Sequence, residues 1–115
     1  MRSTEDVFND HLQLALVGDV DTDIHRNFAQ DCVLLTTYGV FRGYTGVREA
    51  ADLLMRQLPN ARYHYRTKMY HGEIAFLEWD AVADGAQVDD GADSFLIRSG
   101  VIEVMTIHYT VRPKP

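Results

Sequence analysis

The sequence predicts an α+β fold in which helices pack on one face of a curved antiparallel sheet. Three observations indicate this class. Apolar residues recur at helical spacing in the first half, the pattern changes to period two from Arg62 onward, and residue pairs typical of hairpin turns punctuate the second half. At 115 residues, the chain is long enough to bury a core, and a single domain is expected over residues 1–115.

Three helices are expected in the first half of the chain. Ser3 and Asp6 form a capping signal for the first helix, and Gly18 closes it. Asp19 or Asp21 provides the cap of the second helix. The expected spans are residues 3–18, 19–30 and 45–58.

Two short strands are expected before the third helix and four after it. The run "CVLLTT" is apolar and rich in strand-forming residues, and Tyr38-Gly39 turns the chain back toward "VFRG". Gly91 interrupts the third of the later strands, so it is a candidate β-bulge. The hairpin signals are His71-Gly72, Asp84-Gly85 and Ser99-Gly100. The later strands are expected over residues 62–71, 73–83, 86–98 and 101–112.

Charge and composition narrow the class of partner. Eleven basic against seventeen acidic residues give a net charge of -6, which argues against nucleic acid or an anionic membrane surface as the partner. The N-terminus has no apolar signal core and no apolar run approaches membrane-spanning length, so we expect a cytoplasmic protein. The single cysteine, Cys32, lies in an apolar run and is expected to be a buried, inert thiol.

Three segments together resemble the nuclear transport factor 2-like superfamily, which includes ketosteroid isomerases and SnoaL-like polyketide cyclases. These segments are "GDVDTDIHRNFAQDCVLL", "GVFRGYTGVREAADLL" and "DSFLIRSGVIEVMTIHYTV", and they cover nearly the whole chain. The resemblance implies a cone-shaped, cystatin-like α+β roll with a pocket for a hydrophobic small molecule between the concave sheet face and the helices. It also implies a homodimer formed through the convex face; the alternative is that this face is exposed to solvent.

Strand parity combined with this resemblance predicts the side chains that face the pocket. On the last three strands these are Leu77, Trp79 and Ala81, then Asp93, Phe95 and Ile97, then Met105, Ile107 and Tyr109. From these we expect the ligand-binding walls to be Leu77, Trp79, Phe95, Met105 and Tyr109, joined by Thr36, Tyr38 and Met55 from outside those strands. On the opposite face, Arg62, His64, Arg66, Lys68 and Tyr70 are expected to alternate along one side of their strand.

Asp93 is the first candidate catalytic residue. It shares the inward phase with Phe95, and burial of a lone carboxyl among aromatic rings would raise its pKa. By the resemblance, it falls where ketosteroid isomerases keep a protonated aspartate, a carboxylic acid that an apolar site holds neutral. The alternative is that Asp93 is one more solvated acid of the "DDGAD" turn.

His11 is the second candidate, because it lies on or beside the buried stripe of the first helix and can exchange a proton near neutral pH. The resemblance places it where the isomerases carry the tyrosine of the oxyanion hole. The alternative is a structural histidine at the edge of the stripe. We predict that His11 and Asp93 lie within reach of each other, directly or through one water molecule.

Thr36 departs from the isomerase pattern. The resemblance places it at the position of the aspartate that moves the proton, and threonine cannot act as that base. Steroid-type isomerisation is therefore in doubt.

Three functions remain open at this stage. The first is acid–base chemistry on a hydrophobic carbonyl compound, with no cofactor, by an isomerase, cyclase or lyase. The second is a non-catalytic ligand-binding or dimerisation module. The third is hydrolysis, such as epoxide opening, which usually needs several carboxylates around one water. No metal site, phosphate-binding loop or nucleophile motif is evident.

Overall fold

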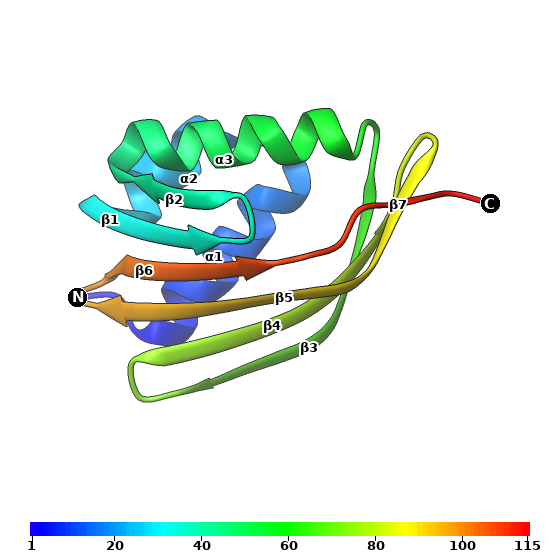
Figure 1. Cartoon of the computed structure of the whole chain (residues 1–115). Helices are drawn as coiled ribbons and strands as arrows, with labels where there is room; N and C mark the ends of the chain where they lie inside the picture. Colours follow the sequence, from blue (N-terminus) through cyan, green and yellow to red (C-terminus); the bar gives the residue numbers. More distant parts are fainter.

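A computed structural model describes all 115 residues and shows three helices and a curved seven-stranded sheet (Figure 1). The helices are α1 (Thr4–Val17), α2 (Val20–Asn27) and α3 (Gly43–Gln57). The strands are β1 (Phe28–Thr36), β2 (Gly39–Arg42), β3 (Arg62–His71), β4 (Ile74–Val82), β5 (Ala86–Arg98), β6 (Val101–His108) and β7 (Arg112–Pro113). The α+β class and the curved sheet with three N-terminal helices are confirmed.

The sheet is mixed rather than wholly antiparallel. Its order is β2-β1-β6-β5-β4-β3, with β7 paired to β5, and the β1–β6 pair is parallel. The other pairs are antiparallel, and three of them are consecutive hairpins on one path, β3-β4-β5-β6. A short turn forces a hairpin to be antiparallel, whereas β1 and β6 are joined through α3 and four strands, so no turn determines their relative direction.

The helix boundaries follow the capping chemistry of their ends. Ser3 accepts a hydrogen bond from the Asp6 backbone while the Asp6 side chain accepts one from Ser3, and Gly18 ends α1 in the left-handed conformation. Asp19 is the cap of α2. This helix ends at Asn27 rather than near residue 30, because Phe28 is already extended. The third helix starts at Gly43, two residues before the predicted start, without a side-chain cap.

Bulges shift the side-chain parity of two strands. Between Tyr65 and Thr67 the register of β3 against β4 slips, so Lys68 pairs with the inward-facing Leu77. The basic residues of β3 therefore do not all share one face, as the simple alternation predicted. The register of β4 against β5 also slips, between Trp79 and Ala81. There Val88 faces Ala81 and Gly91 faces Trp79, so the bulge predicted at Gly91 begins directly beside it.

The helices cover the inner face of the sheet. Helix α1 packs over β3, β4 and β5, and α3 packs over β1 and β2. Figure 1 shows α1 and α2 behind the strands and α3 along the upper edge. Cys32 is buried as expected, and burial raises the pKa of its thiol. No helix is long and apolar enough to cross a membrane.

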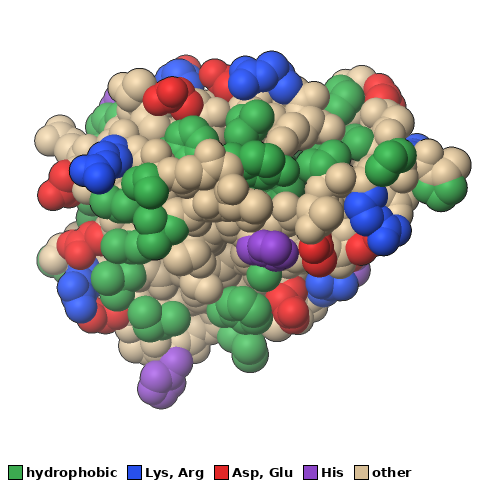
Figure 2. Space-filling model, in the orientation of Figure 1, with side chains coloured by type: hydrophobic (Ala, Val, Ile, Leu, Met, Phe, Trp, Pro, Cys, Tyr) green, Lys and Arg blue, Asp and Glu red, His purple; other side chains and the backbone are tan.

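The outer face of the sheet carries exposed apolar side chains. Figure 2 shows them in several patches, with most charged side chains toward the margins of the face. The exposed large apolar residues on these strands include Leu35, Val40, Met69, Ile74 and Val82.

Candidate functional site

A cavity of about 740 Å³ lies between the inner face of the sheet and the three helices. Of its 32 lining residues, 25 are hydrophobic, which is typical of a site for an apolar small molecule with a few polar groups to orient it. The lining contains three residues with an acid or imidazole side chain, His11, Asp23 and Asp93, and no lysine or arginine.

The predicted pocket residues nearly all line this cavity. Ala81, Phe95 and Ile97 are the exceptions, since they are buried in the core and do not line the cavity. Phe95 is 1% exposed and packs edge-on against Phe8 and His11, with ring centroids 5.3 and 5.4 Å away. It therefore supports His11 from behind instead of forming a wall. The predicted residues that do line the cavity are His11, Thr36, Tyr38, Met55, Leu77, Trp79, Asp93, Met105 and Tyr109.

Asp93 is a buried carboxyl and not a solvated turn acid. Its side chain projects inward from β5, and its Oδ1 accepts a hydrogen bond from Trp79 Nε1 at 3.1 Å. Burial raises its pKa to about 7, although the Trp79 hydrogen bond and the charge of His11 oppose that rise. The second oxygen has no protein partner, and no unpartnered side-chain oxygen is fully buried. That oxygen therefore opens onto the cavity.

Gly91 makes room for the Trp79 indole that bonds Asp93. The two residues face each other across the β4–β5 ladder. A Cβ atom at Gly91 would lie 2.3 Å from the indole ring. The glycine of the "DDGAD" segment therefore lets the indole lie flat over the strand backbone, so that its Nε1 reaches the carboxyl.

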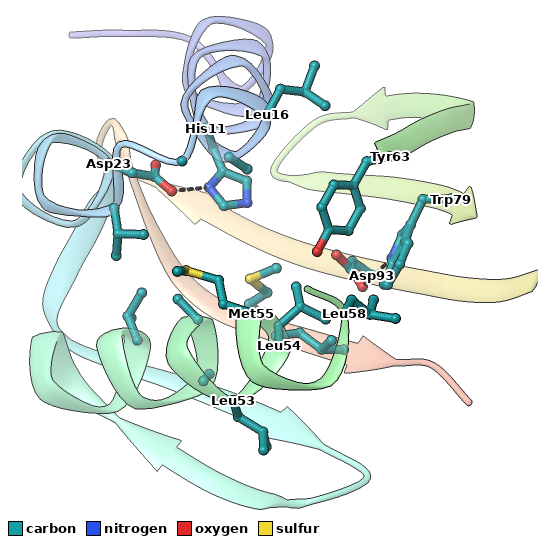
Figure 3. Close-up of a pocket in the computed structure, with 18 of the residues that line it drawn as sticks. His11, Leu16, Asp23, Leu53, Leu54, Met55, Leu58, Tyr63, Trp79 and Asp93 are labelled. Carbon is teal, nitrogen blue, oxygen red and sulfur yellow. Dashed lines mark hydrogen bonds and ion pairs between the residues drawn. The ribbon is translucent and has the colours of Figure 1, made fainter. Parts of the chain in front are cut away.

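His11 is paired with a carboxylate that sequence analysis did not single out. Its Nδ1 lies 2.7 Å from Asp23 Oδ2, and the ring points into the cavity (Figure 3). Burial lowers the pKa of His11, but the charge and hydrogen bond of Asp23 outweigh burial, with help from Asp93 and Asp10, so the pKa is raised overall. Nε2 has no protein partner and opens onto the cavity.

His11 and Asp93 thus reach the same cavity from opposite layers of the fold. No hydrogen bond joins them, because His11 bonds Asp23 and Asp93 bonds Trp79. Each still senses the charge of the other, which shifts both pKa values. Two groups coupled in this way titrate as a pair.

Asp23 was missed because the acids of "DVDTD" all resemble helix caps. Only Asp19 caps α2, by accepting from the Thr22 backbone. Asp23 instead lies on the buried face of the helix, together with Ile24 and Asn27. The four-residue spacing of Asp23 and Asn27, on the same face as Ile24, is the sequence signal that could have identified it.

Two tyrosines of β3 also contribute to the site and were not predicted. The Tyr63 ring packs against Trp79 with centroids 5.6 Å apart, and its hydroxyl points toward Asp93 (Figure 3). Burial raises the pKa of Tyr63 to about 12, so it remains a proton donor at neutral pH. Tyr65 donates to the Leu12 carbonyl at 3.0 Å and ties the sheet to α1 beside His11.

Two other polar side chains of the lining, Tyr109 and Thr36, have structural partners. Tyr109 donates to Gln57 Oε1 at 2.6 Å, which joins the end of the sheet to α3. The Thr36 hydroxyl donates to the Gly39 carbonyl and accepts from the Tyr38 backbone, so it holds the β1–β2 turn. No cluster of three or more histidine, cysteine or acidic side chains is arranged to hold a metal ion.

Solved structures share this architecture at low sequence identity. An NTF2-like protein of unknown function from Mesorhizobium loti matches with a TM-score of 0.78 at 18% identity, over 93% of this chain and 90% of that one. A candidate ketosteroid isomerase from Kribbella flavida matches with a TM-score of 0.78 at 10% identity, over 97% and 81% of the two chains. A candidate polyketide cyclase from Sinorhizobium meliloti matches with a TM-score of 0.76 at 16% identity, over 92% and 99%.

These likenesses show that the chain has the nuclear transport factor 2-like fold, with an apolar cavity on the helix side of its sheet. No protein-family model matches the sequence, and no curated protein does. Because one fold carries many functions, the function has to be argued from the cavity itself.

Proposed function

We propose that the protein is an enzyme that transfers a proton on a hydrophobic carbonyl compound without a cofactor. The proposal depends on one observation. A histidine–aspartate pair and a buried carboxyl with a raised pKa both face the same apolar cavity. Titratable groups whose environments tune them toward neutral pH are typical of acid–base catalysis.

In this scheme His11 is the base. Nδ1–H donates to Asp23, which leaves the Nε2 lone pair facing the cavity. Nε2 removes a proton from the carbon next to the substrate carbonyl, and the ionised Asp23 stabilises the imidazolium that forms.

Asp93 supplies the matching acid. As the C–H bond breaks, its electrons form a carbon–carbon double bond and the carbonyl π electrons move to oxygen. The carboxylic acid of Asp93 donates its proton to that oxygen, and the Tyr63 hydroxyl provides a second donor on the same side of the cavity. The pair therefore ends with the same total number of protons, with His11 protonated and Asp93 ionised.

The enol can then follow either of two courses. Return of the proton from His11 to a different carbon gives an isomer. Attack of the enol carbon on a second carbonyl of the same molecule closes a ring, and the oxygen of that carbonyl takes the proton from His11 to become a hydroxyl. In both courses the proton returns to Asp93 at the end, so the protein is regenerated.

The lining favours an uncharged substrate. Without a lysine or arginine in the cavity, a carboxylate or phosphate on the ligand would lose its hydration without gaining a cationic partner. The descriptions of two structural neighbours as a candidate ketosteroid isomerase and a candidate polyketide cyclase also support this class of chemistry.

Hydrogen–deuterium exchange tests the proposal directly. The probe is 2-tetralone in D₂O, and proton NMR follows loss of the signals next to its carbonyl. The protein should accelerate this exchange, and His11→Ala or Asp93→Asn should reduce the acceleration by about 100-fold or more. His25→Ala and Asp89→Asn, which change an exposed histidine and an exposed aspartate, should leave the rate unchanged.

Two outcomes would contradict the proposal. The first is exchange that does not respond to either site variant. The second is binding of the probe, followed by Trp79 fluorescence, with no accelerated exchange. This second outcome would favour the non-catalytic binding module.

A further inference from the structure

Asn27 lies behind the His11–Asp23 pair and is completely buried at the end of α2. Its Nδ2 donates to Asp23 Oδ1 at 2.9 Å and to Asp10 Oδ2 at 2.8 Å. Its Oδ1 accepts from Arg2 Nη1 at 2.7 Å. The Oδ1 and Nδ2 atoms of the Asn27 side chain are therefore both hydrogen-bonded, and Nδ2 donates to two carboxylates.

These partners permit one orientation of the amide. Both amide hydrogens point at carboxylates, and the amide oxygen points at a guanidinium. Rotation of the amide by half a turn would place NH₂ against Arg2 and the oxygen against Asp10 and Asp23. Each of those contacts would place a donor against a donor or an acceptor against an acceptor, so the observed orientation is strongly preferred.

We infer that Asn27 is the positioning residue of the site, because its amide holds Asp23 Oδ1 so that Oδ2 faces His11 Nδ1. The consequence extends one step further. With Nδ1 held by Asp23, the His11 ring presents Nε2 to the cavity. Asn27 makes no hydrogen bond to His11 and does not line the cavity, so it acts through the carboxylates that it holds, chiefly Asp23.

The outer side of the network is anchored to the protein surface. Arg26 bonds Asp10 through two hydrogen bonds of 2.7 Å, which hold the carboxylate that receives the second Asn27 hydrogen. Arg2 also donates to the carbonyl of Gly100 at 3.0 Å and to that of Arg26. The network therefore runs without a break from the surface to the histidine.

The charged groups that act on His11 come from three elements. They are Asp23 on α2, Asp10 on its own helix α1, and Asp93 on β5. Loss of the Asn27 amide changes none of these charges, so its effect on His11 reports the orientation of Asp23 and, to a smaller extent, that of Asp10.

The test is an NMR titration of the His11 ring in the whole chain. Asn27→Ala should lower the His11 pKa by about one unit, because a carboxylate free to rotate no longer offsets the burial of the imidazole. Asn27→Ser keeps one donor and should produce a smaller fall. Asn9→Ala, an exposed asparagine on α1, is the matched control and should leave the pKa unchanged.

A second measurement needs no variant. Above the pKa of His11, the ¹⁵N shifts of the parent protein should report the Nδ1–H tautomer. The Nε2–H tautomer, or an unchanged His11 pKa in folded Asn27→Ala or Asn27→Ser protein, would overturn the inference.

The link to activity rests on the proposed function, whereas the titration does not. If the proton-transfer proposal is right, Asn27→Ala should also slow the deuterium exchange of 2-tetralone. A shifted pKa with no exchange in any variant would retain the positioning role and reject the proposed reaction. If the exchange still depends on His11 but the His11 pKa is unchanged in Asn27→Ala, the proposed reaction would be retained and the positioning role rejected.

Discussion

The burial of Asp93 should make the stability of the protein depend on pH in a specific way. The pKa of this carboxyl rises from 3.8 to about 7 on folding. Below about pH 4, both the folded and the unfolded chain hold the proton, so the group has no net effect. Between about pH 4 and 7 the unfolded chain releases the proton and the folded chain retains it, so stability falls as pH rises.

The size of this loss follows from the shift itself. About three pKa units correspond to about 4 kcal/mol of unfolding free energy by pH 8. Asp93→Asn replaces the carboxyl with a neutral group that still accepts from Trp79 Nε1, and so removes this term. We expect this term to separate the variant from the parent by only about 1 kcal/mol at pH 4.5, and to make the variant the more stable at pH 8 by up to about 4 kcal/mol.

Urea denaturation at half-unit steps from pH 4.5 to 8 measures this difference. Asp89→Asn, an exposed acid on the same strand, is the control and should track the parent at every pH. In parallel, NMR of the Asp93 side-chain carbon should show titration near pH 7, and His11→Ala should move it higher because the charge of His11 lowers it. The argument that this carboxyl is desolvated would be refuted if the stability of the parent and of Asp93→Asn changed equally with pH and the Asp93 carboxyl titrated near about 3.9.

Two further predictions concern packing and assembly. Gly91→Ala should destabilise the fold by about 1–3 kcal/mol and shift the emission of the only tryptophan, since the new Cβ would overlap the Trp79 ring; an unchanged melting temperature and spectrum would contradict this packing. We also propose a homodimer through the outer sheet face, on which apolar side chains are exposed. Light scattering should give twice the chain mass and Leu35→Glu should halve it, whereas a monomer mass for the parent at micromolar concentration would overturn the proposal.

The sequence predicted the features of the fold that depend on near neighbours. Capping at Ser3 and Gly18, and the hairpin glycines, are local signals that each determine one boundary. The parallel β1–β6 pair was not predictable in this way, because its partners are about 70 residues apart in the chain. The bulge after Tyr65 was missed as well, since no glycine marks it.

In the candidate site, too, the features set by local sequence were predicted and the contacts between distant segments were not. The period-two phase of β4 to β6 correctly placed Trp79 and Asp93 on the inner face, since parity along a strand is a local property. The partner of His11 was not predicted, because Asp23 belongs to another helix and meets it only through the packing of α1 on α2. Tyr63 was not predicted, because no inward-facing set was assigned to β3 from its alternation.

The proposed base and the proposed acid lie in different layers of the fold, one on a helix and one on the sheet. In the isomerases that the sequence resembles, the proton-moving aspartate belongs at the position of Thr36, but here that hydroxyl holds a turn. The proposed base instead belongs to α1 and the proposed acid to β5, so the distance between them depends on how the helix packs on the sheet. Phe95 and Tyr65 contribute to that packing, since the Phe95 ring lies edge-on to His11 with centroids 5.4 Å apart and the Tyr65 hydroxyl donates to the Leu12 carbonyl. The buried Phe95 therefore supports the position of the proposed base without lining the cavity.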